Sequence, residues 1–275
     1  MSGLMDGKRG LVMGVANDHS IAWGIAKALG AQGAQLAFTY QVEALARRVK
    51  PLAASVGSEF VLPCDVEDIA SVDAVFAEIG RQWGKLDFLV HAIGFSDRTQ
   101  LLGRYADTTR ENFVRTMVIS CFSFTEAAKR AAALMPNGGA MLTLTYNGGD
   151  RAMPNYNVMG PAKAALESSV RYLAVDFGPQ AIRVNAISSG PIRTLAGAGI
   201  GDARAMFAFQ QRHSPLHRGV TLDELGGAGL YLLSDLSTGV TGEIHFVDSG
   251  YNIIAMPHPD ALRADHKAAA DDAEK

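Results

Sequence analysis

The sequence has little cysteine and no strong net charge, and these two features exclude several classes of protein. The 275-residue chain contains only two cysteines, Cys64 and Cys121, with no Cys-x-x-Cys or Cys/His spacing. We therefore expect neither a disulfide framework nor a bound metal. The formal net charge is -3 at pH 7, which gives no basic field to attract nucleic acid. A nucleic-acid partner is not expected.

A long apolar run is also absent. No stretch of about 18 apolar residues could span a bilayer, and the polar, glycine-broken residues 1–9 do not form a signal peptide. We therefore expect no membrane insertion and a cytoplasmic location. With 48% hydrophobic residues, the chain still has enough apolar side chains for a full core.

Short apolar runs alternate with segments of helical period, which is typical of a parallel sheet with helices on both faces. The predicted strands are 10–15, 34–39, 59–63, 88–91, 140–145, 182–186 and 243–247. The predicted helices are 22–32, 42–54, 69–83, 110–135, 156–177 and 221–234, the last with Thr221 as its N-cap. No proline-rich or charge-rich linker divides the chain before residue 256. The sequence thus predicts an α/β fold: a single doubly wound Rossmann-type domain, residues 1–256, with a seven-stranded parallel sheet.

Two segments interrupt this alternation. Residues 188–214 are rich in glycine and alanine and follow the sixth predicted strand, at the edge where open α/β sheets bind ligands. We expect a flexible substrate-binding loop there, with an ordinary surface connection as the alternative. Residues 257–275 are polar and lack apolar periodicity, so a disordered C-terminal tail is expected.

Signals for a dinucleotide follow the first three predicted strands. Gly14 lies where a tight turn would bring backbone amides to a pyrophosphate. Gly24 is the second glycine of this segment, although no G-x-G-x-x-G is present. Tyr40 and Gln41 follow the second strand, and the first arginines after it, which could bind a 2′-phosphate, are at positions 47 and 48. This favours NADH over NADPH. Asp65, after the third strand, suits an adenine amino group, although a helix cap is an equally good interpretation.

A tyrosine and a lysine provide the catalytic hypothesis. Hydride transfer to a conjugated thioester or a carbonyl places negative charge on oxygen, and a positioned hydroxyl stabilises it. A nearby lysine favours ionisation of the tyrosine and holds the cofactor ribose. Tyr156 and Lys163 are seven residues apart, which predicts nearly the same face of one helix, and Tyr146 lies ten residues earlier. No tyrosine in the chain has lysine four residues later, which is the commoner reductase spacing.

These motifs together resemble the bacterial enoyl-acyl carrier protein reductases of the short-chain dehydrogenase/reductase superfamily. The matching stretches occur in order between residue 7 and about residue 256. They are Gly14 with 20–22, 38–41, 64–66, 91–95, 156–163, 183–187 and 190–194.

The resemblance implies an activity and a set of site residues. Hydride from NADH would reach the β-carbon of a trans-2-enoyl thioester while Tyr156 bonds the carbonyl oxygen. The implied partners are acyl carrier protein and three further copies of the chain in a homotetramer. The implied catalytic residues are Tyr146, Tyr156 and Lys163, and the substrate would contact Phe95, Ser96, Tyr146 and Tyr156. The implied cofactor site is Gly14, Ser20, Ile21, Gln41, Asp65, Val66, Ile93, Gly94, Lys163, Ile192, Arg193, Thr194, Leu195 and Ala196.

Two other functions remain open at this point. A carbonyl or alcohol oxidoreductase of the same superfamily would carry lysine four residues after tyrosine and a serine about a dozen residues before it. Here positions 143 and 145 are threonine, and the lysine follows Tyr156 by seven residues instead of four. A catalytically silent nicotinamide-binding regulator would have lost Tyr156 or Lys163, and both are present. Ala92, where many members of the family have serine, departs from the pattern without touching this pair.

Overall fold

The computed structural model describes residues 3–192, 203–260 and 263. Within these ranges seven parallel strands form one sheet in the order β3-β2-β1-β4-β5-β6-β7. The strands are β1 Arg9–Met13, β2 Gln35–Tyr40, β3 Val61–Pro63, β4 Phe88–His91, β5 Gly139–Thr145, β6 Ile182–Ser189 and β7 Ile244–Val247. The predicted doubly wound α/β fold is confirmed, with strand bounds that differ from the predictions by one to a few residues.

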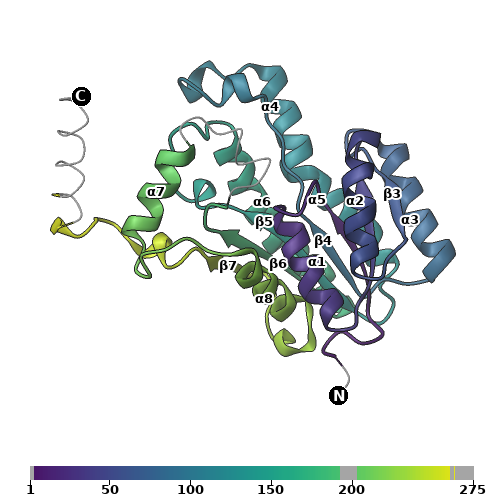
Figure 1. Ribbon diagram of the computed structural model, residues 1–275. Coiled ribbons are helices and arrows are strands. Elements are labelled where there is room, and N and C mark those ends of the chain that lie inside the picture. The colour runs from purple at the N-terminus through teal and green to yellow at the C-terminus, as the bar shows by residue number, and fades with distance from the viewer. Residues whose placement is uncertain (1–2, 193–202, 261–262, 264–275) are drawn as a thin grey trace.

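Helices cover both faces of this sheet (Figure 1). One face carries α1 Ile21–Ala31, α2 Glu43–Ser55 and α8 Leu222–Leu233; the other carries α3 Ile69–Trp83, α5 Ser123–Ala133 and α6 Met159–Phe177. Successive strand residues feed the two cores in turn: Leu11 and Met13 pack with α3, α5 and α6, whereas Val12 packs with α1, α2 and α8. Strands buried on both faces need apolar side chains at every position, which explains the continuous apolar runs. None of the helices in the described ranges is long and apolar enough to cross a membrane.

Glycine brings α1 and α8 into close contact. A Cβ on Gly226 would lie 2.6 Å from the Gly24 carbonyl oxygen, and a Cβ on Gly229 would lie 2.9 Å from the Ile25 side chain. The helices therefore approach at backbone distance. Gly24, which stands ten residues after Gly14, serves this helix packing.

Three predicted segments differ from the structure. The helix predicted over 110–135 is α4 Arg110–Met117 and α5, joined by one π-helical segment, η3 Val118–Phe122. The helix predicted from Tyr156 begins only at Met159. The segment 188–214 contains the end of β6 and an eleven-residue helix, α7 Ala203–His213, while residues 193–202 lie outside the described residues.

Short helical turns complete the connections. They are η1 Arg98–Gln100, η2 Tyr105–Asp107, η4 Asn147–Gly149, η5 Gly178–Gln180, η7 Asp235–Ser237 and η8 Tyr251–Ile253. The predicted N-cap Thr221 is confirmed: its side chain accepts from the Glu224 amide, and Glu224 bonds back to the Thr221 amide. Most of the predicted tail after residue 256 lies outside the described residues, so its disorder stays a prediction.

Candidate active site

The strand order reverses between β1 and β4, and this switch point is where ligands bind in open α/β sheets. Gly14 follows β1 with φ +100°, a conformation that side chains rarely adopt. A Cβ at this position would lie 2.1 Å from the carbonyl oxygen of Ala92, the residue after β4. Only glycine therefore allows the chain leaving β1 to pass the end of β4.

The loop from Gly14 into α1 is fixed by Ser20. Its buried hydroxyl oxygen accepts from the backbone amides of Ala16 and Asn17 at 3.0 and 3.1 Å. The first turn of α1 contains no acidic residue, so its free amides face no competing anion. This loop fits the pyrophosphate of a dinucleotide, as predicted for Gly14, Ser20 and Ile21.

Gln41 and Asp65 lie together although they follow different strands. The amide nitrogen Nε2 of Gln41 lies 3.4 Å from Oδ1 of Asp65, a long hydrogen bond across the ends of β2 and β3. The same Asp65 oxygen accepts from the Glu67 amide at 3.0 Å, which holds the carboxylate in place. An amide and a carboxylate at this edge suit the hydroxyls and amino group of an adenosine.

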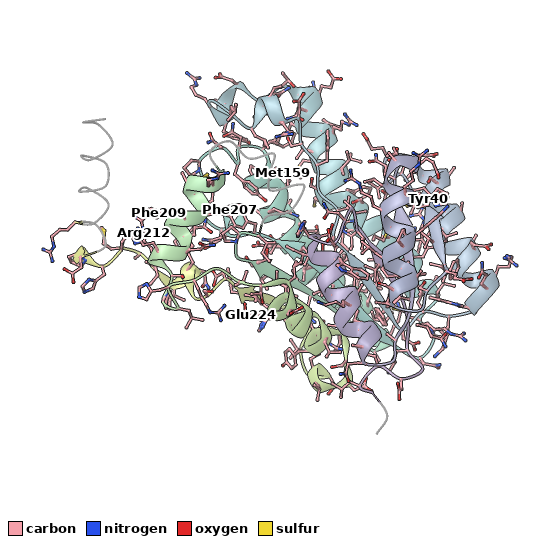
Figure 2. The ribbon with its side chains drawn as sticks, in the orientation of Figure 1. Tyr40, Met159, Phe207, Phe209, Arg212 and Glu224 are labelled. Atoms are coloured by element: carbon pink, nitrogen blue, oxygen red, sulfur yellow. The ribbon has the colours of Figure 1, made fainter. Side chains whose placement is uncertain are left out.

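A cavity of about 370 Å³ lies next to the loop that precedes α1. Loop residues, α7 and the start of α8 enclose it. Its lining is His19, Pro191, Ile192, Arg204, Phe207, Ala208, Gln211, Val220 and Leu222. Among these, Ile192 is a predicted cofactor residue. Figure 2 shows Phe207 and Phe209 on α7 to one side of Met159, and Tyr40, at the end of β2, to the other.

Lys163 is buried at the centre of this edge, with 7% of its surface exposed. Its Nζ donates to the Leu144 carbonyl oxygen at 2.8 Å, at the end of β5. A Cβ on Gly94 would lie 3.8 Å from that nitrogen, so the chain after β4 passes close to the ammonium group. Burial lowers the pKa of Lys163 from its usual 10.5 to about 8. The ammonium group of Lys163 is therefore buried beside Gly94 and bonded to the Leu144 carbonyl.

Tyr156 does not lie on the helix that carries Lys163, so the prediction of one helical face is wrong. Tyr156 lies in the turn before α6, between Asn155 with φ +57° and Asn157 with φ +38°. Helical periodicity does not apply across two left-handed residues. Tyr156 is nevertheless buried, and burial raises the pKa of its phenol, so the hydroxyl keeps its proton.

Asn157 ties this turn to a neighbouring loop. Its Nδ2 lies 3.1 Å from the carbonyl oxygen of Gln100 and 3.4 Å from those of Leu102 and Gly103. On the opposite side, a Cβ on Gly148 would lie 2.4 Å from the Tyr156 ring. The turn is therefore held by an amide on one side and by close packing on the other.

Tyr146 follows β5 directly and contacts Tyr156. The two rings meet edge to face, with centroids 5.1 Å apart. Burial raises the pKa of Tyr146, so this phenol is also protonated at neutral pH. The hydroxyl of Tyr146 accepts a 2.7 Å hydrogen bond from Gln210 of α7. The structure thus brings two protonated phenols together, as the sequence predicted for the substrate site.

The residues after β4 are positioned by the π-helical segment. Phe95 donates its amide to Ser120 Oγ and accepts from the same hydroxyl at its carbonyl, both at 2.9 Å. Its side chain is 40% exposed. Ser96 is buried, and its hydroxyl bonds with Asn112 and Thr116. The Arg115 guanidinium lies over the Phe95 ring, 4.6 Å from its centroid, whereas Ser96 holds the loop from its buried side.

Sequence reasoning missed two polar groups at this site. Gln210 bonds to Tyr146, and Glu167 accepts from the Thr145 hydroxyl at 2.6 Å, one helical turn after Lys163. The spacing of four residues between Lys163 and Glu167 was a signal that could have identified the glutamate. The predicted residues Arg193, Thr194, Leu195 and Ala196 lie outside the described residues. Within the described ranges no cluster of histidine, cysteine and acidic residues suits a metal ion.

The sequence matches a known protein family. The sequence model of one family, described as enoyl-(acyl carrier protein) reductase, matches residues 14–252. The chain belongs to the enoyl-acyl carrier protein reductase family. It is 74% identical to the enoyl-[acyl-carrier-protein] reductase [NADH] 2 of Rhizobium meliloti over 96% of this chain and 98% of that protein. It is 52% identical to the NADH-dependent reductase FabI of Salmonella typhimurium over 92% of this chain and 97% of that protein.

Solved structures of this reductase family agree with the fold. FabI from Candidatus Liberibacter asiaticus superposes with a TM-score of 0.92 at 60% identity, covering 94% of this chain and all of that one (100%). The reductase from Anaplasma phagocytophilum, solved in complex with NAD, gives 0.91 at 55% identity, covering 94% and 98% of the two chains. The resemblance stated from the sequence is confirmed.

Proposed function

We propose that this reductase uses NADH to reduce the trans-2 double bond of enoyl-acyl carrier protein thioesters in bacterial type II fatty acid elongation. The observation that carries the proposal is the buried Lys163 ammonium between β5 and Gly94, with the phenols of Tyr146 and Tyr156 in contact at the same edge. A cation for the cofactor and protonated hydroxyls for a developing oxyanion are the groups this reduction requires. Family membership supplies the substrate class.

The residues present fit a bound NADH. Gly14, Ser20 and Ile21 would hold the pyrophosphate at the start of α1, because Gly14 has no side chain and the first turn of α1 contains no acidic residue. Ile93 and Gly94 would lie beside the adenosine portion. The adenosine ribose and adenine would be read by Gln41, Asp65 and Val66. The nicotinamide half would contact Lys163 and the segment Ile192, Arg193, Thr194, Leu195 and Ala196.

The protein's own groups act on the substrate oxygen. NADH, when bound, supplies the hydride. Tyr156 and Tyr146 keep their protons at neutral pH because burial raises the pKa of both phenols. Each therefore presents a hydrogen-bond donor where negative charge develops on the thioester carbonyl oxygen.

Lys163 holds the cofactor ribose in this scheme. Within the described residues its ammonium donates to the Leu144 carbonyl, which leaves two hydrogens for ribose hydroxyls. The low pKa reflects the cost of keeping the cation buried. Acyl carrier protein delivers the substrate, the enzyme is cytoplasmic, and four copies form a homotetramer; the last two features follow the family pattern.

The test is the consumption of NADH by the purified protein with a crotonyl or longer trans-2-enoyl thioester, followed by absorbance. We expect steady oxidation of NADH, a slower reaction with NADPH, and none with a simple ketone. Tyr156→Phe removes one hydroxyl while keeping the ring, and its matched control is Tyr172→Phe on the exposed end of α6. The absence of oxidation with both cofactors would refute the proposal, and turnover of the ketone would favour the carbonyl reductase instead.

A further inference from the structure

Gln210 is a buried polar residue on a largely exposed helix. It has 4% of its surface exposed, whereas the preceding Phe209 is 42% exposed and Gln211 is exposed as well. A buried amide without hydrogen bonds costs free energy, and a buried apolar side chain carries no such cost. We therefore expect the buried Gln210 amide to make a hydrogen bond.

The partner of that amide is the phenol of Tyr146. Gln210 Nε2 donates to Tyr146 Oη at 2.7 Å, across 64 residues of sequence. Because the phenol oxygen accepts this bond, its own hydrogen remains available for another acceptor. The bond also connects α7 to the residue that follows β5.

We propose that Gln210 is a positioning residue that directs the Tyr146 hydroxyl hydrogen toward the substrate carbonyl and ties α7 to that hydroxyl. The Gln210 amide donates to the phenol oxygen of Tyr146, so the Tyr146 hydroxyl interacts with the substrate by donating its own hydrogen. This inference rests on the proposed role of Tyr146 in the reaction. A donated hydrogen bond also makes the phenol a stronger donor, and it opposes the increase in the pKa of Tyr146 that burial causes.

Because Tyr146 and Tyr156 are in edge-to-face contact, a change at Gln210 would also affect Tyr156. The Tyr146 ring packs on Tyr156 with centroids 5.1 Å apart. A rotation of Tyr146 away from α7 would therefore disturb both hydroxyls. We expect Gln210 to influence turnover more than cofactor affinity, because its amide bonds to the tyrosine.

Two variants of Gln210 separate bonding from packing. Gln210→Met keeps the volume and removes the donor, and we expect kcat to fall about three- to tenfold, the effect of one lost hydrogen bond. Gln210→Glu places a carboxylate there, which only accepts, so the Tyr146 hydrogen is drawn away from the substrate. We expect its kcat to be lower than that of Gln210→Met at alkaline pH and to rise as the pH falls and the carboxyl group gains a proton.

The matched control is Gln82→Met on α3. Gln82 Nε2 also donates a 2.7 Å hydrogen bond, to Glu78 on the exposed surface far from the site. Its kcat and pH profile should equal those of the unmodified enzyme. Titration with NADH, followed by nicotinamide fluorescence, should give similar affinities for all variants, which shows that the site is assembled.

A double-mutant cycle with Tyr146→Phe completes the test. If Gln210 acts through the phenol, the Gln210→Met change has no further effect on kcat once Tyr146 lacks its hydroxyl. Independent, multiplicative losses would overturn the proposal, as would a Gln210→Met enzyme with full kcat or a Gln210→Glu pH profile parallel to that of the unmodified enzyme. An unmodified enzyme that consumes no NADH would instead refute the proposed function.

Discussion

Replacing the buried Lys163 by methionine should stabilise the protein while removing its affinity for NADH. The fall in the pKa of Lys163 from 10.5 to about 8 means that the folded state disfavours the charged lysine by about 3 kcal/mol. Methionine fills a similar volume without a charge. Loss of the 2.8 Å bond to Leu144 costs about 1 kcal/mol in return. We therefore expect a net gain of about 2 kcal/mol near neutral pH for the free enzyme.

The pH dependence makes this prediction specific. Below about pH 8 lysine is protonated in both the folded and the unfolded chain, so the whole penalty is present. Between the folded pKa of about 8 and the usual value of 10.5, the folded state releases the proton first, and the penalty declines as the pH rises. The advantage of Lys163→Met should therefore shrink by roughly 2 to 3 kcal/mol between about pH 7 and about pH 10.

Urea unfolding at a fixed protein concentration measures this difference. The unmodified enzyme and Lys163→Met are compared at both pH values, with Lys129→Met as a control, because Lys129 is exposed on α5. The control should shift stability little, and equally, at both pH values. A Lys163→Met variant with the same advantage at the two pH values, or with unchanged affinity for NADH, would refute the reasoning.

Three further predictions concern the backbone and the cofactor. Gly14→Ala should lower the free energy of unfolding by at least about 2 kcal/mol, because its Cβ meets the Ala92 carbonyl. The control Gly7→Ala, also at positive φ but in open space, should lower it by about 1 kcal/mol. Equal losses of the two variants in urea unfolding would contradict the clash at Gly14. Gln41→Arg should raise the ratio of kcat/KM for NADPH over NADH about tenfold or more, and an unaltered ratio would show that this position does not read the ribose. Asn157→Gly keeps the left-handed backbone but removes the amide, so kcat should fall about tenfold; full activity would mean that the bonds to 100–103 do not position Tyr156.

Several features could be predicted because they depend on neighbouring residues alone. The apolar runs located all seven strands, since a strand buried on both faces needs apolar side chains throughout. The capping residue Thr221 was identified because a cap involves residues only three positions apart. Tyr146 was expected at this edge because the carboxyl ends of parallel strands lie together there, whereas Lys163 was assigned from its spacing to Tyr156 and from the family resemblance.

Other features could not be predicted from local patterns. The periodicity of α6 suggested that the helix included Tyr156, but the helix begins only at Met159, after the left-handed Asn155 and Asn157. The Asn157 side chain is held by a loop 57 residues away in the sequence. Gly24 resembled a nucleotide glycine until α8 was seen packed against it.

The sequence by itself determined the succession of strands and helices along the chain, because the alternation of apolar segments suffices for that. Its motifs determined the reductase family. Only the tertiary structure decided how the phenols are held: Gln210 reaches Tyr146 from 64 residues away, and Gly14 passes Ala92 between strands that are not consecutive. These contacts exist because the fold brings distant backbone segments together, and a pattern among adjacent residues does not show which distant segments will meet.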